Sequence, residues 1–227
     1  MNKIKLLSLK GVTIEMKKLK IAVDGFDGTG KTTLINKLIQ EYKGKYSCLV
    51  ERLIPSSVAL FKTYANNTQE YVERMSDQFR VTSYLWESYI RLELKKEIYD
   101  DTDIVFFDRW IFPYLTKPID FQQDEGIVNY LISSIPKPDI LFLIYASEEN
   151  IIKHLKGKND WMLAIFTEDQ LRFKIREFYN EYEKLLRKFS LNYLVLDGNS
   201  TIDALHIIMK SELENLMYGI RKENTNE

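Results

Sequence analysis

The chain has 227 residues, with 32 lysines and arginines against 33 aspartates and glutamates, giving a formal net charge of −1. This balance excludes the strongly basic surface of a general nucleic-acid binder, and one cysteine with two histidines excludes cysteine-rich and histidine-based metal sites. A hydrophobic content of 45% with 29% charged residues is typical of a globular domain.

The two ends of the chain differ in pattern from the rest. Residues 1–17 are expected to be an N-terminal extension, because the compact pattern begins after Met16 with a basic stretch and an apolar strand. No apolar run reaches the roughly 18 residues of a membrane span, and no signal peptide is recognisable. We therefore expect a cytoplasmic protein with no membrane or nucleic-acid partner, one domain over 18–218 and a polar tail over 219–227.

Between the ends, short apolar runs alternate with longer amphipathic stretches. The apolar runs predict strands at 19–24, 47–53, 103–108, 140–146 and 193–197. The amphipathic patterns predict helices over 31–43, 68–76, 77–99, 121–134, 147–156, 167–189 and 201–217. This alternation predicts an α/β fold with a parallel sheet and helices on both faces. Ligands of such sheets bind at the carboxyl ends of the strands, so functional residues are expected there.

The first strand is followed by a glycine-rich motif, GFDGTGKTT over 25–33, which satisfies G-x-x-x-x-G-K-[ST]. Its glycines let successive amides face one phosphate group, and the following helix adds its N-terminal dipole. In this motif Lys31 reaches the β- and γ-phosphates and the Thr32 hydroxyl ligates Mg²⁺. An ordinary glycine-rich turn is the alternative, but a chance match has a probability on the order of 1%. The predicted ATP-binding residues are Gly25, Phe26, Asp27, Gly28, Thr29, Gly30, Lys31, Thr32 and Thr33.

The third strand ends in Asp108 and Arg109, within FFDRW. An aspartate at a strand end opposite a phosphate loop is well placed to hold Mg²⁺ and its water. The planar guanidinium of Arg109 can bridge phosphate groups and stabilise the charge that develops during transfer. The alternative is that Asp108 only caps the next turn and Arg109 is only solvated.

Several motifs together resemble the thymidylate kinase family of nucleoside-monophosphate kinases. They are VDGFDGTGKTT at 23–33, FFDRW at 106–110, KPDILFLIYASEENIIKHL at 137–155, KIREFYNEYEKL at 174–185 and LVLDGNSTIDALHIIM at 194–209. The resemblance covers nearly all of residues 18–217. It implies a P-loop NTPase fold with a five-stranded parallel sheet, ATP and Mg²⁺ as cofactors, a nucleotide substrate, a mobile lid and a homodimer.

The resemblance also implies roles for individual residues. Asp27 would face the acceptor sugar and Arg109 would contact the acceptor phosphate. Trp86 stands where the family places a phenylalanine that stacks on the acceptor base, although a tryptophan on an apolar helix face is more often core. Arg91 is displaced by one position from the family's arginine, which rotates it by roughly 100° on a helix. Asn199, after the last strand, would lie against adenine.

The chain departs from the family in the lid and the base-reading residues. The lid offers Lys156 and Lys158 where arginines are usual, and lysine lacks the bidentate fork. We count both lysines among the catalytic residues. After FFDRW, Pro113, Lys117 and Pro118 replace the family's base-reading residues. The catalytic residues are thus largely present, whereas those that read thymidine are largely substituted.

Three functions remain open. The first is ATP- and Mg²⁺-dependent transfer to a nucleoside monophosphate, either dTMP or a related nucleotide, for which no general base is needed and Arg52 would contact the acceptor phosphate. The second is a deoxynucleoside kinase, in which Glu51 would serve as the base, although a strand-end glutamate is usually solvated. The third is a nucleotide-binding accessory protein with little turnover. His154 and His206 are expected to be packing or surface residues.

Overall fold

Five strands form the central sheet in the computed structural model, which describes residues 6–9, 12–15, 17–53, 74–116 and 125–219. The strands are β3 (Leu19–Gly25), β4 (Cys48–Glu51), β5 (Ile104–Asp108), β6 (Ile140–Tyr145) and β7 (Tyr193–Asp197). Their order is β4-β5-β3-β6-β7, and every neighbouring pair is parallel. The α/β fold with a five-stranded parallel sheet is therefore confirmed.

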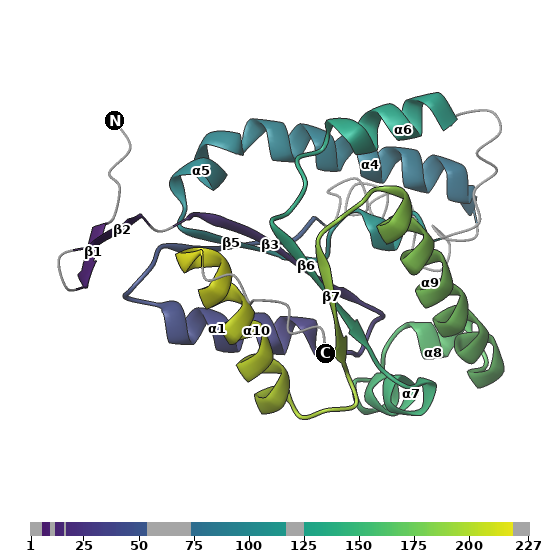
Figure 1. Ribbon diagram of the computed structural model, residues 1–227. Helices are drawn as coiled ribbons and strands as arrows, with labels where there is room; N and C mark the ends of the chain where they lie inside the picture. The colour runs from purple at the N-terminus through teal and green to yellow at the C-terminus, as the bar shows by residue number, and fades with distance from the viewer. Residues whose placement is uncertain (1–5, 10–11, 16, 54–73, 117–124, 220–227) are drawn as a thin grey trace, which may run out of the picture.

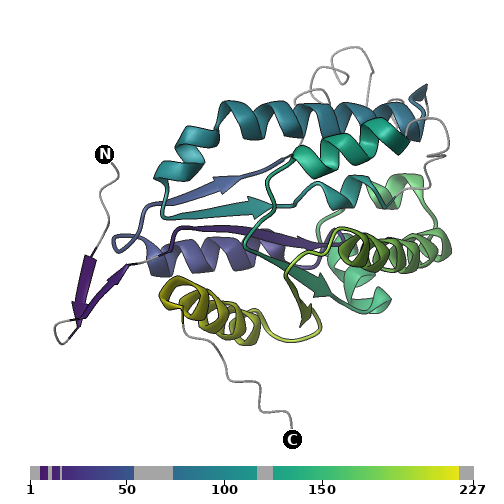
Figure 2. The ribbon, with the colours of Figure 1, turned by 45° about the horizontal axis from the view of Figure 1, so that its top comes forward.

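Helices cover both faces of this sheet, as Figure 1 shows. On one face lie α1 (Lys31–Tyr42) and α10 (Ile202–Tyr218), which contact each other. On the other lie α4 (Asp77–Leu94), α6 (Glu125–Ser134) and α9 (Glu168–Lys188). Figure 2 shows this three-layer arrangement with the sheet between the two groups of helices. The predicted placement of helices on both faces is confirmed.

The sheet is buried because its strands are apolar on both sides. Side chains of β3 and β5 alternate between two core clusters, one beneath α1 and α10 and one beneath α4, α6 and α9. Continuous apolar strands are what a parallel sheet covered on both faces requires. Asp24 is a polar residue of β3 that is nonetheless fully buried.

The helix boundaries differ from the predictions in three places. The predicted helix over 77–99 is divided at Lys95 into α4 and α5 (Lys96–Asp101). Two short elements were not predicted, the helix α8 (Met162–Ile165) and a 3₁₀ turn at Phe112–Tyr114. The predicted helix over 147–156 is present as α7 (Glu148–Gly157). Most of the predicted helix over 68–76 and the start of that over 121–134 lie outside the described residues, as do Lys117, Pro118 and most of the tail.

The expected N-terminal extension contains a hairpin that the sequence patterns did not predict. Strands β1 (Leu6–Leu9) and β2 (Val12–Glu15) pair antiparallel in a separate two-stranded sheet. Figures 1 and 2 both show this hairpin projecting from the side of the central sheet. Among the described residues, no helix combines the length and apolar character needed to cross a bilayer.

Candidate active site

The loop between β3 and α1 has the conformation of a phosphate cradle. Gly25, Gly28 and Gly30 have φ values of 146°, 86° and 86°, which L side chains rarely adopt. A Cβ at Gly25 would also lie 2.6 Å from the Ile144 carbonyl oxygen of the neighbouring strand β6. Glycine at these positions therefore permits the turn, and at Gly25 it also permits the close approach to β6.

Lys31 is buried inside this loop. Its Nζ donates to the carbonyl oxygens of Gly25 at 2.9 Å and Phe26 at 2.7 Å. Burial is the main reason that the pKa of Lys31 is lowered to about 7, and the nearby Arg109 guanidinium contributes to this shift. An amine in this position gains most from an anionic ligand, because phosphate oxygens would supply the counter-charge that burial removes. The structure thus places the Lys31 amine inside the loop, while its predicted contact with phosphates stays a prediction.

Thr32 and Asp108 form the pair of oxygens predicted to bind Mg²⁺. The parallel pairing of β3 with β5 sets Val23 opposite Asp108, and the Thr32 hydroxyl donates to Asp108 Oδ2 at 2.8 Å. A hydroxyl and a carboxylate are oxygen donors of the kind Mg²⁺ prefers, so the residues fit this ion. In the described part of the chain no group of three or more histidine, cysteine or acidic side chains is placed to hold a metal, so the other ligands would be phosphate oxygens and water.

Arg109 lies directly above the loop. Its backbone has a φ of 80°, unusual for arginine, while its amide donates to the Val23 carbonyl at 3.1 Å. The guanidinium pairs with Asp27 and also approaches the Gly25 carbonyl at 3.5 Å. Backbone strain at one residue is common where a side chain must be aimed at a functional site. The structure therefore brings Arg109 and Asp27 together beside the phosphate loop, in an ion pair that the sequence did not predict.

Asp24 and Tyr182 are site residues that the sequence reasoning missed. The buried Asp24 carboxylate accepts from the Trp110 amide at 3.0 Å and from the Tyr182 hydroxyl. Burial is the main reason that the pKa of Asp24 is raised. The carboxylate thus connects the end of β3, the segment after β5 and helix α9 beneath the loop. A lone acid in the apolar run IAVD was the available signal, whereas Tyr182 was hidden among the apolar residues of its helix.

His154 on α7 also contacts the loop. Its Nδ1 lies 2.8 Å from the Gly28 carbonyl oxygen, so the ring must carry a proton on Nδ1 and donate it. A Cβ at Gly28 would lie 3.4 Å from His154 Cβ, which shows how closely α7 approaches. Sequence reasoning placed His154 among packing or surface residues, and the structure shows that it connects α7 to the phosphate loop.

Two residues predicted for the acceptor side, Arg52 and Arg91, lie at the end of β4 and on one flank of α4. Arg91 donates to the Arg52 carbonyl at 2.8 Å and to Glu87 at 3.0 Å, so it reaches the end of β4 despite its displaced position. Glu51 is only 6% exposed, not solvated as expected. Its carboxylate binds Lys95 at 2.6 Å and Arg91 at 3.5 Å. These ion pairs fasten α4 to the edge strand.

Trp86 lies on a different side of α4. It is five residues from Arg91, which is about 140° around a helix, and 46% of it is exposed. The structure therefore does not bring Trp86 to the predicted acceptor residues, and it is not core either. Tyr84, which is 8% exposed, and Arg80, which is 6% exposed, lie on the same flank as Arg91. The sequence showed an aromatic helix, but not which aromatic faces the site.

The remaining predicted residues are the two lid lysines, Lys156 and Lys158, and Asn199 after β7. Lys156 pairs with Glu168 at 2.7 Å, and Lys158 is exposed at the end of α7. The Asn199 side-chain oxygen accepts from the Ser147 amide at 2.9 Å and from Asn150 at 2.8 Å. The structure does not bring the two lysines together with Arg109, and it uses Asn199 to join the segments after β6 and β7.

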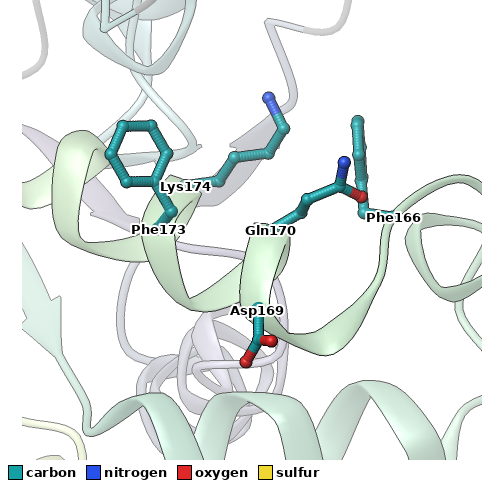
Figure 3. Close-up of a pocket in the computed structure, with 5 residues that line it drawn as sticks. All are labelled: Phe166, Asp169, Gln170, Phe173 and Lys174. Atoms are coloured by element: carbon teal, nitrogen blue, oxygen red, sulfur yellow. The ribbon is translucent and has the colours of Figure 1, made fainter.

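An open hollow of about 510 Å³ lies against the start of α9. In Figure 3 the side chains of Phe166, Gln170, Phe173 and Lys174 point to one side of the helix, while Asp169 points to the other. The Lys174 amine lies 4.6 Å from the centre of the Phe166 ring. None of the predicted site residues lines this hollow, so it is separate from the phosphate loop.

The five-stranded parallel sheet and its phosphate loop define a P-loop protein of the kinase type. The family model described as Thymidylate kinase matches residues 23–207, and the chain belongs to the thymidylate kinase family. This family membership confirms the resemblance found in the sequence.

Curated relatives and solved structures agree with this membership. A "Probable thymidylate kinase" of Sulfurisphaera tokodaii is 27% identical over 82% of this chain and 90% of the relative. A "Probable thymidylate kinase 1" of Saccharolobus solfataricus is 28% identical over 86% of this chain and 99% of the relative. The structure of deoxyadenosine kinase from M. mycoides with bound dATP has a TM-score of 0.63 at 15% identity, covering 86% of this chain and 100% of that one. At that identity the likeness is one of fold.

Proposed function

We propose that this protein transfers a phosphoryl group from ATP·Mg²⁺ to a nucleoside monophosphate, dTMP or a related nucleotide. The observation that carries the proposal is the set of arginines beside the phosphate loop. Arg109 lies over the loop, and Arg91 contacts the backbone of Arg52 at the end of β4. An acceptor phosphate needs such positive charge and no general base, because its oxygens are already ionised.

On the donor side, the loop amides and Lys31 bind the phosphates of ATP. Thr32 and Asp108 hold Mg²⁺, which neutralises phosphate charge when it is bound. Phe26 lies in the loop and packs against Phe178 of α9 with ring centroids 5.4 Å apart, which fixes the loop against the helix that follows the lid. Lys158 at the end of α7 and Lys156 supply the lid's charge, and the Asn199 segment lies near adenine.

On the acceptor side, Arg52 and Arg109 contact the phosphate, and Asp27 faces the sugar. We propose Tyr84 in place of Trp86 as the side chain that stacks on the base, with Arg91 one and a half to two turns further along the same flank of α4. Base stacking on an aromatic ring contributes about 1–3 kcal/mol and tolerates different bases. This suits a site in which the family's thymidine-reading residues are substituted.

A deoxynucleoside kinase is the second candidate, because the deoxyadenosine kinase from M. mycoides shares the fold. That reaction needs a carboxylate free to accept a proton from the 5′-hydroxyl. Glu51 is the candidate base, but it is buried and paired with Lys95 and Arg91. Its two cationic partners favour a structural role over proton transfer. An accessory protein with little turnover is the third candidate.

A coupled ADP-release assay over nucleoside monophosphates and free nucleosides separates the three. We expect turnover with dTMP or another monophosphate, and Glu51→Gln should leave kcat within about threefold once its folding is verified. Turnover with nucleosides alone, lost in Glu51→Gln, would establish the second candidate. Nucleotide binding without turnover on any acceptor would establish the third.

We also propose that the protein is a homodimer through the outer face of α4 and α5. Five large apolar side chains are exposed along this face: Phe79, Trp86, Ile90, Leu94 and Ile98. Exposed apolar stripes of this length are typical of protein interfaces. Sedimentation equilibrium should give twice the 26.9 kDa chain mass, and Leu94→Lys should shift it to the monomer. A monomeric wild type at micromolar concentration would contradict the dimer.

A further inference from the structure

The guanidinium of Arg52 covers the two oxygens proposed to hold Mg²⁺. Its Nη2 donates to Asp108 Oδ2 at 2.6 Å and to the Thr32 hydroxyl oxygen at 3.1 Å. Its Nε donates to the same Asp108 oxygen at 3.2 Å. Asp108 Oδ2 also accepts from the Thr32 hydroxyl at 2.8 Å. One carboxylate oxygen thus receives three donors, two of them from Arg52.

This arrangement leaves no room for a metal ion at the same atoms. Mg²⁺ binds oxygen ligands at about 2.0–2.1 Å and requires nearly octahedral geometry. A guanidinium nitrogen hydrogen-bonded to both ligands would lie within contact distance of the ion and would repel it as a like charge. Either Arg52 or the metal ion can therefore occupy this pair of oxygens, but not both.

The buried carboxylate of Asp108 is the reason that a cationic group lies beside the oxygens of Thr32 and Asp108. Its side chain is only 4% exposed, and a buried carboxylate is costly unless it is paired. The Arg109 guanidinium points to Asp27 instead, so Arg52 makes the direct ion pair with Asp108. Arg52 therefore compensates the charge that the metal ion would otherwise compensate.

Arg52 is also built to move. Its backbone carbonyl is fixed by Arg91 at 2.8 Å, whereas 51% of its side chain is exposed. The guanidinium can leave Asp108 by rotation about side-chain bonds, with β4 and α4 unchanged. Lysine could not replace this behaviour fully, because it lacks the two guanidinium nitrogens, Nε and Nη2, that both donate to Asp108.

We propose that Arg52 is an internal counter-ion that competes with the divalent cation for Thr32 and Asp108. This competition rests on the proposed function, which assigns the metal ion to Thr32 and Asp108. Arrival of the metal with its nucleotide releases the Arg52 guanidinium, which then becomes available to the phosphate of the second substrate. Arg52 is thereby a positioning residue that makes the acceptor side competent only after the donor side is filled.

Manganese binding tests this competition without any turnover. Mn²⁺ is titrated by electron paramagnetic resonance into the protein saturated with a non-hydrolysable ATP analogue, using wild type, Arg52→Gln and Arg176→Gln. Arg176 is a matched control, because it is 58% exposed and pairs with Glu148 outside the loop. We expect Arg52→Gln to bind Mn²⁺ more tightly than wild type by roughly tenfold or more, the lower end of what a hydrogen bond to a charged group supplies, and Arg176→Gln to match wild type.

Thermal unfolding gives a second, independent readout. Without metal ion, Arg52→Gln should unfold at a lower temperature than wild type, and Mn²⁺ with the analogue should raise its Tm by more than it raises the wild-type Tm. Equal or weaker Mn²⁺ affinity in Arg52→Gln would overturn the competition and leave the proposed function standing. Absence of Mn²⁺ binding in all three proteins would overturn both the metal site and the competition.

Discussion

The donor and acceptor sides of the site are built in different ways. The donor side comes from one continuous segment, residues 25–33, whose conformation is imposed by glycines with positive φ. The proposed acceptor side is assembled from β4, α4 and β5, and it depends on strand register and on which flank of a helix faces inward. A local motif therefore fixes the conformation of a phosphate loop by itself, whereas an acceptor pocket forms only when distant segments of the chain have folded together.

The largest expected effect comes from breaking the donor side. Lys31→Ala removes the buried amine that would neutralise the transferred phosphate, so we expect kcat to fall by about 10³-fold or more. Coupled ADP release measures this loss. Lys37→Ala is the matched control, because Lys37 lies on the same helix and pairs with Asp203 away from the loop. Turnover retained in Lys31→Ala would contradict the assignment of the loop.

The acceptor side is tested by a pair of aromatic substitutions on α4. Tyr84→Leu should raise the KM for the acceptor by about tenfold, since it removes a stacking surface from the inward flank. Trp86→Leu should leave that KM within about twofold, because Trp86 lies on the outer flank. Initial rates with varied acceptor at saturating ATP give both values. The reverse order would restore Trp86 as the stacking residue and show that α4 is placed differently.

A smaller effect is expected where α7 meets the loop. His154→Leu removes the donor to the Gly28 carbonyl, so the KM for ATP should rise by about fivefold, as one hydrogen bond supplies roughly 1 kcal/mol. His154→Asn can place an amide donor near the Nδ1 position and should recover most of the loss. Similar KM values for both variants would mean that the contact does not support the loop.

The smallest effect concerns Asp24 and pH. Because burial raises the pKa of Asp24, the folded protein holds this proton at pH values where the unfolded chain has released it. Wild type therefore loses stability as the pH rises through the folded pKa, while Asp24→Asn stays neutral. As the pH rises from about 4 to about 8, the Tm of Asp24→Asn should therefore rise relative to the wild-type Tm. The expected change is about 2–4 °C for each kcal/mol of stability that wild type loses. A pH-independent difference in Tm would contradict the raised pKa.

The same contrast explains what the sequence could and could not predict. The five strands follow from apolar runs, and the candidate roles of Lys31, Thr32, Asp108 and Arg109 follow from two short motifs that each span only a few residues. The orientation of Trp86 depends on the rotational phase of α4. That phase is set by the ion pairs of Glu51, which join residues about 40 positions apart.

The contacts of Asp24 and His154 had a similar origin. Asp24 meets Tyr182 across 158 positions, and His154 meets Gly28 across 126 positions. No pattern within a short window indicates such partners, because each residue alone is compatible with ordinary packing. The division of the predicted helix over 77–99 at Lys95 also follows from tertiary contact, since the Lys95 amine binds Glu51 of the edge strand.

The central claim is that the acceptor atom is a phosphate oxygen and not a sugar hydroxyl. Phosphorus NMR of reactions with ATP·Mg²⁺ and either dTMP or thymidine tests it most directly. We expect the paired resonances of a new nucleoside diphosphate from dTMP, and no new phosphomonoester from thymidine. A phosphomonoester formed from thymidine, with dTMP left unchanged, would contradict it.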